Sequence, residues 1–182
     1  LEVPGRPRAE QKAARFQLCG PDFLRTFGVR LVRGRDFTPQ DVAGARRVAI
    51  VNQALVASHF GGEDPIGRTI VIERPVRARA DGTFDGYSQV VVVGTVSDVV
   101  SGLMFDGTDR GHIYLPMTGG DAHSTAILIA PRAPGDFRPD MLRETFRRLG
   151  ADPDTFEVIE LDELRQTQIY PMHAAAWIGA LL

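Results

Sequence analysis

The stretch His59–Arg68, "HFGGEDPIGR", comes closest in this sequence to a phosphate-binding loop. It carries paired glycines and follows a strand-like run and a helix-like run. A Walker-type loop needs a lysine followed by serine or threonine after its glycines, whereas here an arginine follows. The glycines also come after the predicted helix, at its electronegative end, where Glu63 and Asp64 would repel phosphate. We therefore predict a helix end and a turn into the next strand, not a phosphate site.

The histidines and carboxylates lack the spacing typical of metal sites. No pair among His59, His112, His123 and His173 has the i, i+4 or HExxH arrangement of a zinc helix. The acidic stretches "DGTFDG" and "DGTDRG" lack the alternating oxygen ligands and the final glutamate of an EF-hand, so we predict solvated loops. Isolated carboxylates such as Asp98 and Asp162 are usually surface groups or helix caps. We predict no metal and no cofactor.

The sequence offers no complete set of residues for nucleophilic catalysis. Cys19 is the one thiol, and no base lies near it in the sequence. One cysteine cannot form an internal disulfide, so cysteine usage leaves the redox compartment open. The GxSxG and GxGxxG motifs do not occur. We predict no catalytic residues and no enzyme activity.

The composition indicates a folded globular chain. Its 182 residues fit one domain or two small ones, with 43% apolar and 24% charged residues. The net charge is −2 and the arginines are scattered, so no basic field favours nucleic acid as a partner.

The pattern of elements predicts an α+β fold. Helices are expected at 21–28, 53–60, 138–150 and 162–182, and strands at 16–18, 29–37, 47–51, 67–73, 88–100, 113–117, 124–130 and 154–161. Residues 29–37 alternate as a half-buried strand does, and the unbroken valines of 88–100 indicate burial on both faces. Residues 38–44 are expected to form a surface turn. Mixed order with short crossovers favours split βαβ units, and 16–34 and 47–73 are weakly similar.

Several residues have predicted local roles. Asn52 is expected to cap the helix that follows it, and Asp140 to cap the helix at 138–150. Leu142, Phe146 and Leu149 lie on one stripe of that helix.

The two ends of the chain differ. Residues 1–15 are polar and broken by proline and glycine, so a disordered or weakly ordered lead-in is predicted. The uncharged run 174–182 is too short for a spanning helix, which needs about 20 apolar residues. It is either a buried terminal helix or a spanning helix cut short, and its position at the last residue favours the second.

Several phrases together resemble the periplasmic core domain of MacB/FtsX-like ABC transporter permeases. They are "PDFLRTFGVRLVRGRDF", "VAIVN", "DPIG", "VVVVGTVSDVV", "HIYLP" and "LRETFRRLGADPDTFEVIELDELRQTQIYP". They occur in the order of the family and cover about 16–182. The resemblance extends to the duplicated, ATPase-less permeases of acidobacterial type, and there to the second core domain. "CGPDF" departs from the family's serine-containing "VSPGYF".

The resemblance implies a division of the chain into parts. After the lead-in at 1–15, the periplasmic core domain would cover 16–170. Its porter-like βαβ part would comprise 16–70 and 121–170, and an inserted β-rich part would comprise about 71–120, with the strand 88–99 leading back to the porter-like part. Residues 171–182 would begin a truncated transmembrane helix.

The resemblance also implies a function. The domain would lie on the periplasmic side of the bacterial inner membrane and would be non-catalytic. It would transmit ATP-driven conformational change across the membrane so that substrate is exported. The implied partners are a separate cytoplasmic ATPase subunit and a second copy or paired core domain, and the family also uses membrane-fusion adaptors and outer-membrane channels. The alternative is a soluble periplasmic binding or adaptor module.

Overall fold

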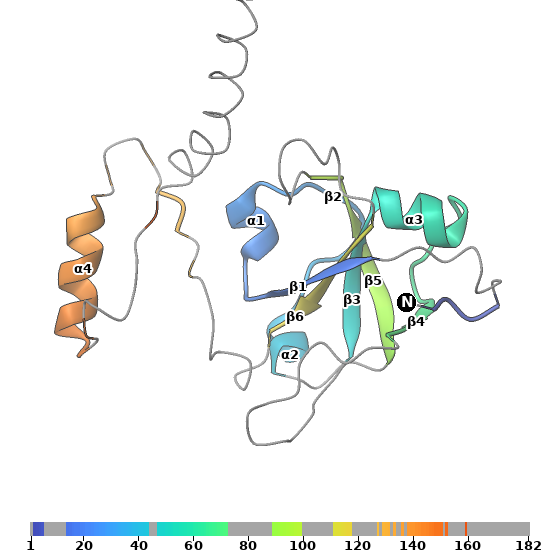
Figure 1. Ribbon diagram of the computed structural model, residues 1–182, viewed down its shortest axis with the longest axis horizontal. Helices are drawn as coiled ribbons and strands as arrows, with labels where there is room; N and C mark the ends of the chain where they lie inside the picture. Colours follow the sequence, from blue (N-terminus) through green and yellow to red (C-terminus); the bar gives the residue numbers. More distant parts are fainter. Residues whose placement is uncertain are drawn as a thin grey trace, which may run out of the picture. The chain divides into compact units, whose positions relative to one another are not determined.

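A computed structural model gives the fold (Figure 1). It describes residues 2–5, 14–43, 47–72, 89–99, 111–117, 127, 129–131, 133, 136, 138–150, 152 and 159. The chain divides into two compact units, Leu1–Ile129 and Ala130–Leu182, which are described separately. The mixture of one sheet with several helices confirms the predicted α+β class.

The first unit is built on one mixed sheet. Its strands are β1 (Arg15–Cys19), β2 (Leu31–Gly34), β3 (Val48–Asn52), β4 (Thr69–Val71), β5 (Gln89–Val96) and β6 (His112–Pro116). The order is β1-β6-β3-β5-β2, and β4 also pairs with β5. The β1–β6 and β3–β5 pairs are parallel, whereas the β6–β3, β5–β2 and β5–β4 pairs are antiparallel.

This order places the strands of the first predicted unit at opposite edges of the sheet. The connection from β1 to β2 through helix α1 (Phe23–Phe27) crosses the sheet, because β6, β3 and β5 lie between the two strands. β2 and β4 share one edge of β5, β2 pairing with its end and β4 with its beginning. β5 therefore pairs with strands from both predicted units: β2 from 16–34, and β3 and β4 from 47–73.

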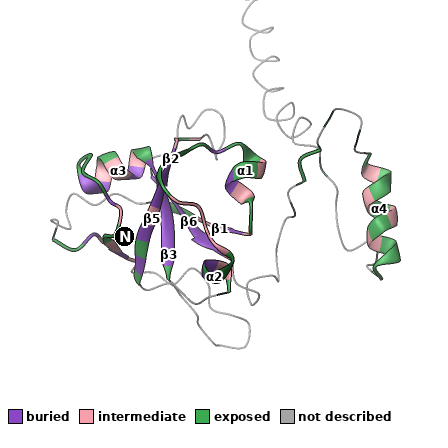
Figure 2. Ribbon diagram, turned by 180° about the vertical axis from the view of Figure 1, so that it is seen from behind, coloured by how far each residue is buried: buried purple, intermediate pink, exposed green. Residues whose placement is uncertain are grey.

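Two apolar clusters, one on each face of the sheet, form the core. Side chains alternate between faces along a strand, so Ile50 and Val51 contribute to different clusters. On one face Leu55 and Phe60 of helix α3 (Gln53–Phe60) pack over the sheet, and on the other Leu24 of α1 does so. Every residue of β3 and of β6 is buried (Figure 2).

Helix α3 begins and ends as the sequence predicted. Asn52 is its N-cap, with Oδ1 accepting the Leu55 N–H at 3.1 Å. Gly61 ends it in the left-handed conformation. The predicted helix at 21–28 is likewise observed as α1, which ends at Gly28.

The predicted surface turn after β2 is wrong, because these residues form a short helix, α2 (Pro39–Val42). Thr38 and Asp41 cap each other reciprocally in a capping box, and Pro39 occupies the first helical turn. Asp41 is buried despite its charge. The signal Thr-Pro-Gln-Asp was present in the sequence.

β2 also differs from its prediction. The alternation in 29–37 predicted a half-buried strand, yet all four residues of β2 are exposed. β2 lies at the edge of the sheet and has a neighbour on one side only, which contributes to this exposure. The burial predicted for 88–100 holds for the second half of β5, but Gln89 and Val91 are exposed.

The sheet also corrects the predicted boundaries. β5 and β6 lie within 71–120, the range predicted as an inserted β-rich part, but both belong to the same sheet as β1–β3. β6 was expected in the insert, whereas β5 was expected to lead back to the porter-like part. Within the lead-in predicted at 1–15, Glu2 pairs with Val71 and Val3 is buried, so this piece is ordered.

In the second unit the structure describes helix α4 (Pro139–Arg148). Its N-cap is Arg138, not the predicted Asp140, which instead pairs with Arg143 at 3.2 Å. None of its residues is buried, and Leu149, beyond its end, is 75% exposed. At 127 and 129–130 the predicted strand is not observed. The predictions for 154–161 and 162–182, including the tail at 171–182, lie outside the described residues apart from Ile159.

Candidate functional site

The turn His59–Arg68 lies where the sequence placed it, between α3 and β4. Its glycines follow the carboxyl end of α3. The Asp64 carboxylate accepts the Ile66 N–H at 3.1 Å, and the Arg68 N–H donates to the Pro65 carbonyl at 3.0 Å. Asp64 and Glu63 also form ion pairs with Arg33 and with Arg68 respectively. The polar groups of the turn are thus engaged in local structure.

The amino end of α3 is filled by side chains of the protein itself. Oδ1 of Asn52 also accepts the His112 N–H at 2.8 Å, so one buried amide joins β3, α3 and β6. Asp98 accepts the Ala54 N–H at 2.8 Å. The isolated carboxylate at 98 is therefore a second cap for α3, one of the two roles expected for such groups.

The described histidines serve packing. His59 is buried, with Nδ1 2.8 Å from the Ser58 hydroxyl, and the His112 ring stacks on Tyr114 at 4.6 Å between centroids. His123, Asp162 and His173 lie outside the described residues. Among the described residues, no group of three or more histidines, cysteines and carboxylates could hold a metal ion.

Cys19 is buried, and its thiol is a poor nucleophile. Burial, aided by the negative charge of Asp36, raises the pKa of its thiol from 9.0 to about 12. A thiol with such a pKa is almost entirely protonated near neutral pH and is a poor nucleophile.

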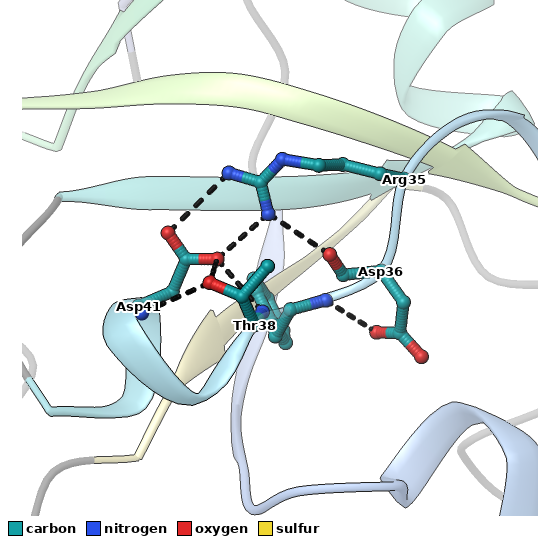
Figure 3. Close-up of polar contacts among 5 residues, drawn as sticks. Arg35, Asp36, Thr38 and Asp41 are labelled. Atoms are coloured by element: carbon teal, nitrogen blue, oxygen red, sulfur yellow. Dashed lines mark hydrogen bonds and ion pairs between the residues drawn. The ribbon is translucent and has the colours of Figure 1, made fainter.

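A dense polar cluster joins the end of β2 to α2 (Figure 3). We name Arg35, Thr38 and Asp41 the clasp. Arg35 Nη1 donates to Asp41 Oδ2 at 2.7 Å, and the Thr38 hydroxyl and backbone N–H donate to the same oxygen at 2.7 and 2.8 Å. Nη1 also donates to the Asp36 carbonyl at 2.9 Å.

The clasp keeps a buried carboxylate ionised. Burial alone would raise the pKa of Asp41, but the hydrogen bonds from Arg35 and Thr38 and the positive charge of Arg35 outweigh it. The result is a pKa lowered from 3.8 to about 2. A carboxylate with this pKa holds no proton near neutral pH, so the clasp is suited to fixing a loop and not to acid–base catalysis.

An open depression lies beside the clasp. Its volume is about 570 Å³, and its described lining is Arg35, Arg47, Val48, Thr69, Gln89, Val90, Val91 and Val93. This lining contains no carboxylate, histidine or thiol, so it provides no acid–base pair. Its chemistry is that of a valine surface bordered by polar groups.

None of the described helices is both long enough and apolar enough to cross a bilayer.

The comparisons with known proteins all point to one family. The chain is 31% identical over 80 residues to the macrolide export ATP-binding/permease protein MacB 2 of Aeromonas hydrophila, covering 42% of this chain and 12% of that protein. It is 28% identical over 148 residues to MacB of Sodalis glossinidius, covering 73% and 20%. The chain thus spans no more than a fifth of the length of these relatives.

The fold is similar to that of the periplasmic region of MacB from Actinobacillus actinomycetemcomitans. The TM-score is 0.56 at 19% identity, covering 86% of this chain and 66% of that one. The model of the MacB-like periplasmic core domain matches residues 3–147, most of the chain. The chain therefore belongs to the MacB-like periplasmic core domain family.

Proposed function

We propose that this domain is a non-catalytic part of a MacB/FtsX-type permease that passes ATP-driven movement across the membrane to export a substrate. The family match over 3–147 carries the proposal. The described part of the chain supports it, because the polar clasp is an ion pair that fixes the end of β2 to α2 and the described lining of the open depression lacks an acid–base pair.

The proposal assigns the domain to the periplasmic side of the inner membrane. The run 174–182 would then begin the spanning helix that follows the domain. A cysteine introduced at the exposed position Gln53 in the full-length protein tests this assignment. We expect a membrane-impermeant maleimide to label it in cells with a permeable outer membrane. Labelling only after the inner membrane is broken would contradict it.

The names of the relatives combine ATP-binding and permease functions, which supports an ATPase as a partner of this permease. We propose that this ATPase is a separate cytoplasmic subunit, and that a second copy or a paired core domain lies beside this one. An adaptor and an outer-membrane channel would complete an exporter.

One experiment separates transmission from the alternative of a soluble binding module. Replacing the domain by a flexible linker in the full-length permease should abolish export while the ATPase subunit still hydrolyses ATP, because the chemistry lies outside this domain. Supplying the domain as a separate periplasmic protein should not restore export, because movement cannot pass through a broken chain. Restoration in trans would favour the binding module.

A further inference from the structure

A junction of three segments lies at the middle of β5. Residues 92–94 of this strand contact the end of β2 and also the turn that connects α3 to β4. β5 is irregular here, since Ala49 pairs with Val92 and Ile50 with Gly94, which leaves Val93 bulged from β3. Segments distant in the sequence therefore meet where the ladder is interrupted.

Backbone hydrogen bonds attach both segments to adjacent residues of β5. The Arg35 N–H donates to the Val93 carbonyl at 3.0 Å, which attaches the end of β2. The Gly67 N–H donates to the Val92 carbonyl at 2.8 Å, and the Val92 N–H donates to the Arg68 carbonyl at 2.9 Å. The end of β2 and the turn are thus bonded to neighbouring residues of the same strand.

Two glycines allow the close approach. A Cβ on Gly94 would overlap the Arg35 carbonyl oxygen, and a Cβ on Gly34 would overlap the Val93 carbonyl oxygen. Gly34 also has a φ of +78°, which side chains rarely adopt. The Ile66 Cδ1 would lie 3.0 Å from the same added Cβ, so the turn packs directly on β2.

We infer that this junction, formed by Gly34, Arg35, Ile66, Gly67 and residues 92–94, joins β2 and the turn into one cooperative unit with β5. An exposed edge strand such as β2 would ordinarily open first and alone. Here its opening breaks the packing that also holds the turn, so the two segments open together.

The inference concerns the stiffness of the first unit and does not depend on the proposed transport role. If hydrogen exchange contradicts the inference, the proposed transport role is unaffected. If the transport role proves wrong, the inference about the junction is unaffected. If both hold, the two predicted βαβ-like units, 16–34 and 47–73, move as one body.

Native-state hydrogen exchange of the 182-residue chain tests it at a series of low urea concentrations. The amides of Arg35, Gly67 and Val92 should exchange through one shared opening, with rates that rise in parallel with urea. Faster exchange of Arg35 alone, with a different urea dependence, would overturn the inference. This measurement needs no variant and so does not depend on any variant folding.

A variant makes the test sharper. Gly94→Ala should raise exchange at both Arg35 and Gly67, each by about tenfold or more, since an added Cβ must push two backbones apart. Gly20→Ala is the matched control, because its Cβ would meet only the Met117 Cε at an ordinary 3.7 Å and should change neither rate. Faster exchange at Arg35 with an unchanged rate at Gly67 would overturn the inference.

Discussion

β3 and β2 flank the same strand, β5, on its two sides, yet they have opposite environments. All five residues of β3 are buried and all four of β2 are exposed. Both sequences are rich in β-branched or aliphatic residues. Strand propensity alone therefore does not decide burial here. Each strand is followed by a capped helix, with a neutral buried amide after β3 and a charged clasp after β2.

The largest expected effect comes from the core side of this comparison. Ile50→Ala should lower the free energy of unfolding by about 2–5 kcal/mol, because Ile50 is fully buried and its truncation leaves a cavity. Leu31→Ala removes the same number of atoms from a residue that is 39% exposed, so about 1 kcal/mol or less is expected. Urea unfolding measures both. Equal losses of stability in the two variants would contradict the difference in burial between β3 and β2.

The cap after β3 should rank next. Asn52→Ala removes the acceptor for the Leu55 and His112 N–H groups, both in buried surroundings, so about 2–3 kcal/mol is expected. Gln53→Ala changes the exposed neighbouring residue and should be nearly silent. A cost for Asn52→Ala no larger than for this control would show that the amide does not join the three elements.

The clasp after β2 should add a dependence on acid. The pKa of Asp41 is lower in the folded chain, at about 2, than its ordinary 3.8, so the unfolded state binds more protons between these values. Its contribution is complete above about pH 5 and is lost as the pH falls toward 2. We expect about 1–2 kcal/mol, reduced by the exposure of Arg35.

Urea unfolding at pH 6 and pH 2.5 measures this contribution. Asp41→Asn should be less stable than the parent at pH 6, and the difference should shrink at pH 2.5. Asp140→Asn, on the exposed face of α4, is the control and should show little change. An equal difference in the free energy of unfolding at both pH values would show that the ionised form of Asp41 does not stabilise the fold.

The smallest effect is expected at the exposed ion pair between β2 and the turn. Arg33 and Asp64 lie 3.0 Å apart, with side chains 67% and 42% exposed. Arg33→Gln should cost less than about 1 kcal/mol, and 1 M salt should remove most of that cost. A larger cost that 1 M salt removes would mean that charge, and not glycine packing, attaches β2 to the turn.

Sequence reasoning succeeded where the cause is local. The cap at Asn52, the ends of α1 and α3 and the turn at 61–68 all depend on residues within a few positions of one another. The helix at 39–42 was equally local, and its Thr-x-x-Asp capping box was overlooked.

What could not be predicted depends on long-range pairing. The place of β2 at the edge of the sheet contributes to its exposure, and the contact between Gly34 and Gly94 follows from β5 joining two distant segments. The place of β6 between β1 and β3 was missed for the same reason, because strand patterns do not reveal which sheet a strand joins. The function was predicted from the stretches that resemble the permease family, because no group of residues in the sequence indicated a function.

The burial of Cys19 has a practical consequence for spectroscopy. It is the single cysteine of the chain, and its protonated thiol is shielded by the core. Reagents that modify thiolates should therefore leave it unmodified in the folded state. Pairs of introduced surface cysteines can then carry spin labels or fluorophores with little background, so the natural chain already serves as its own unlabelled reference for distance measurements.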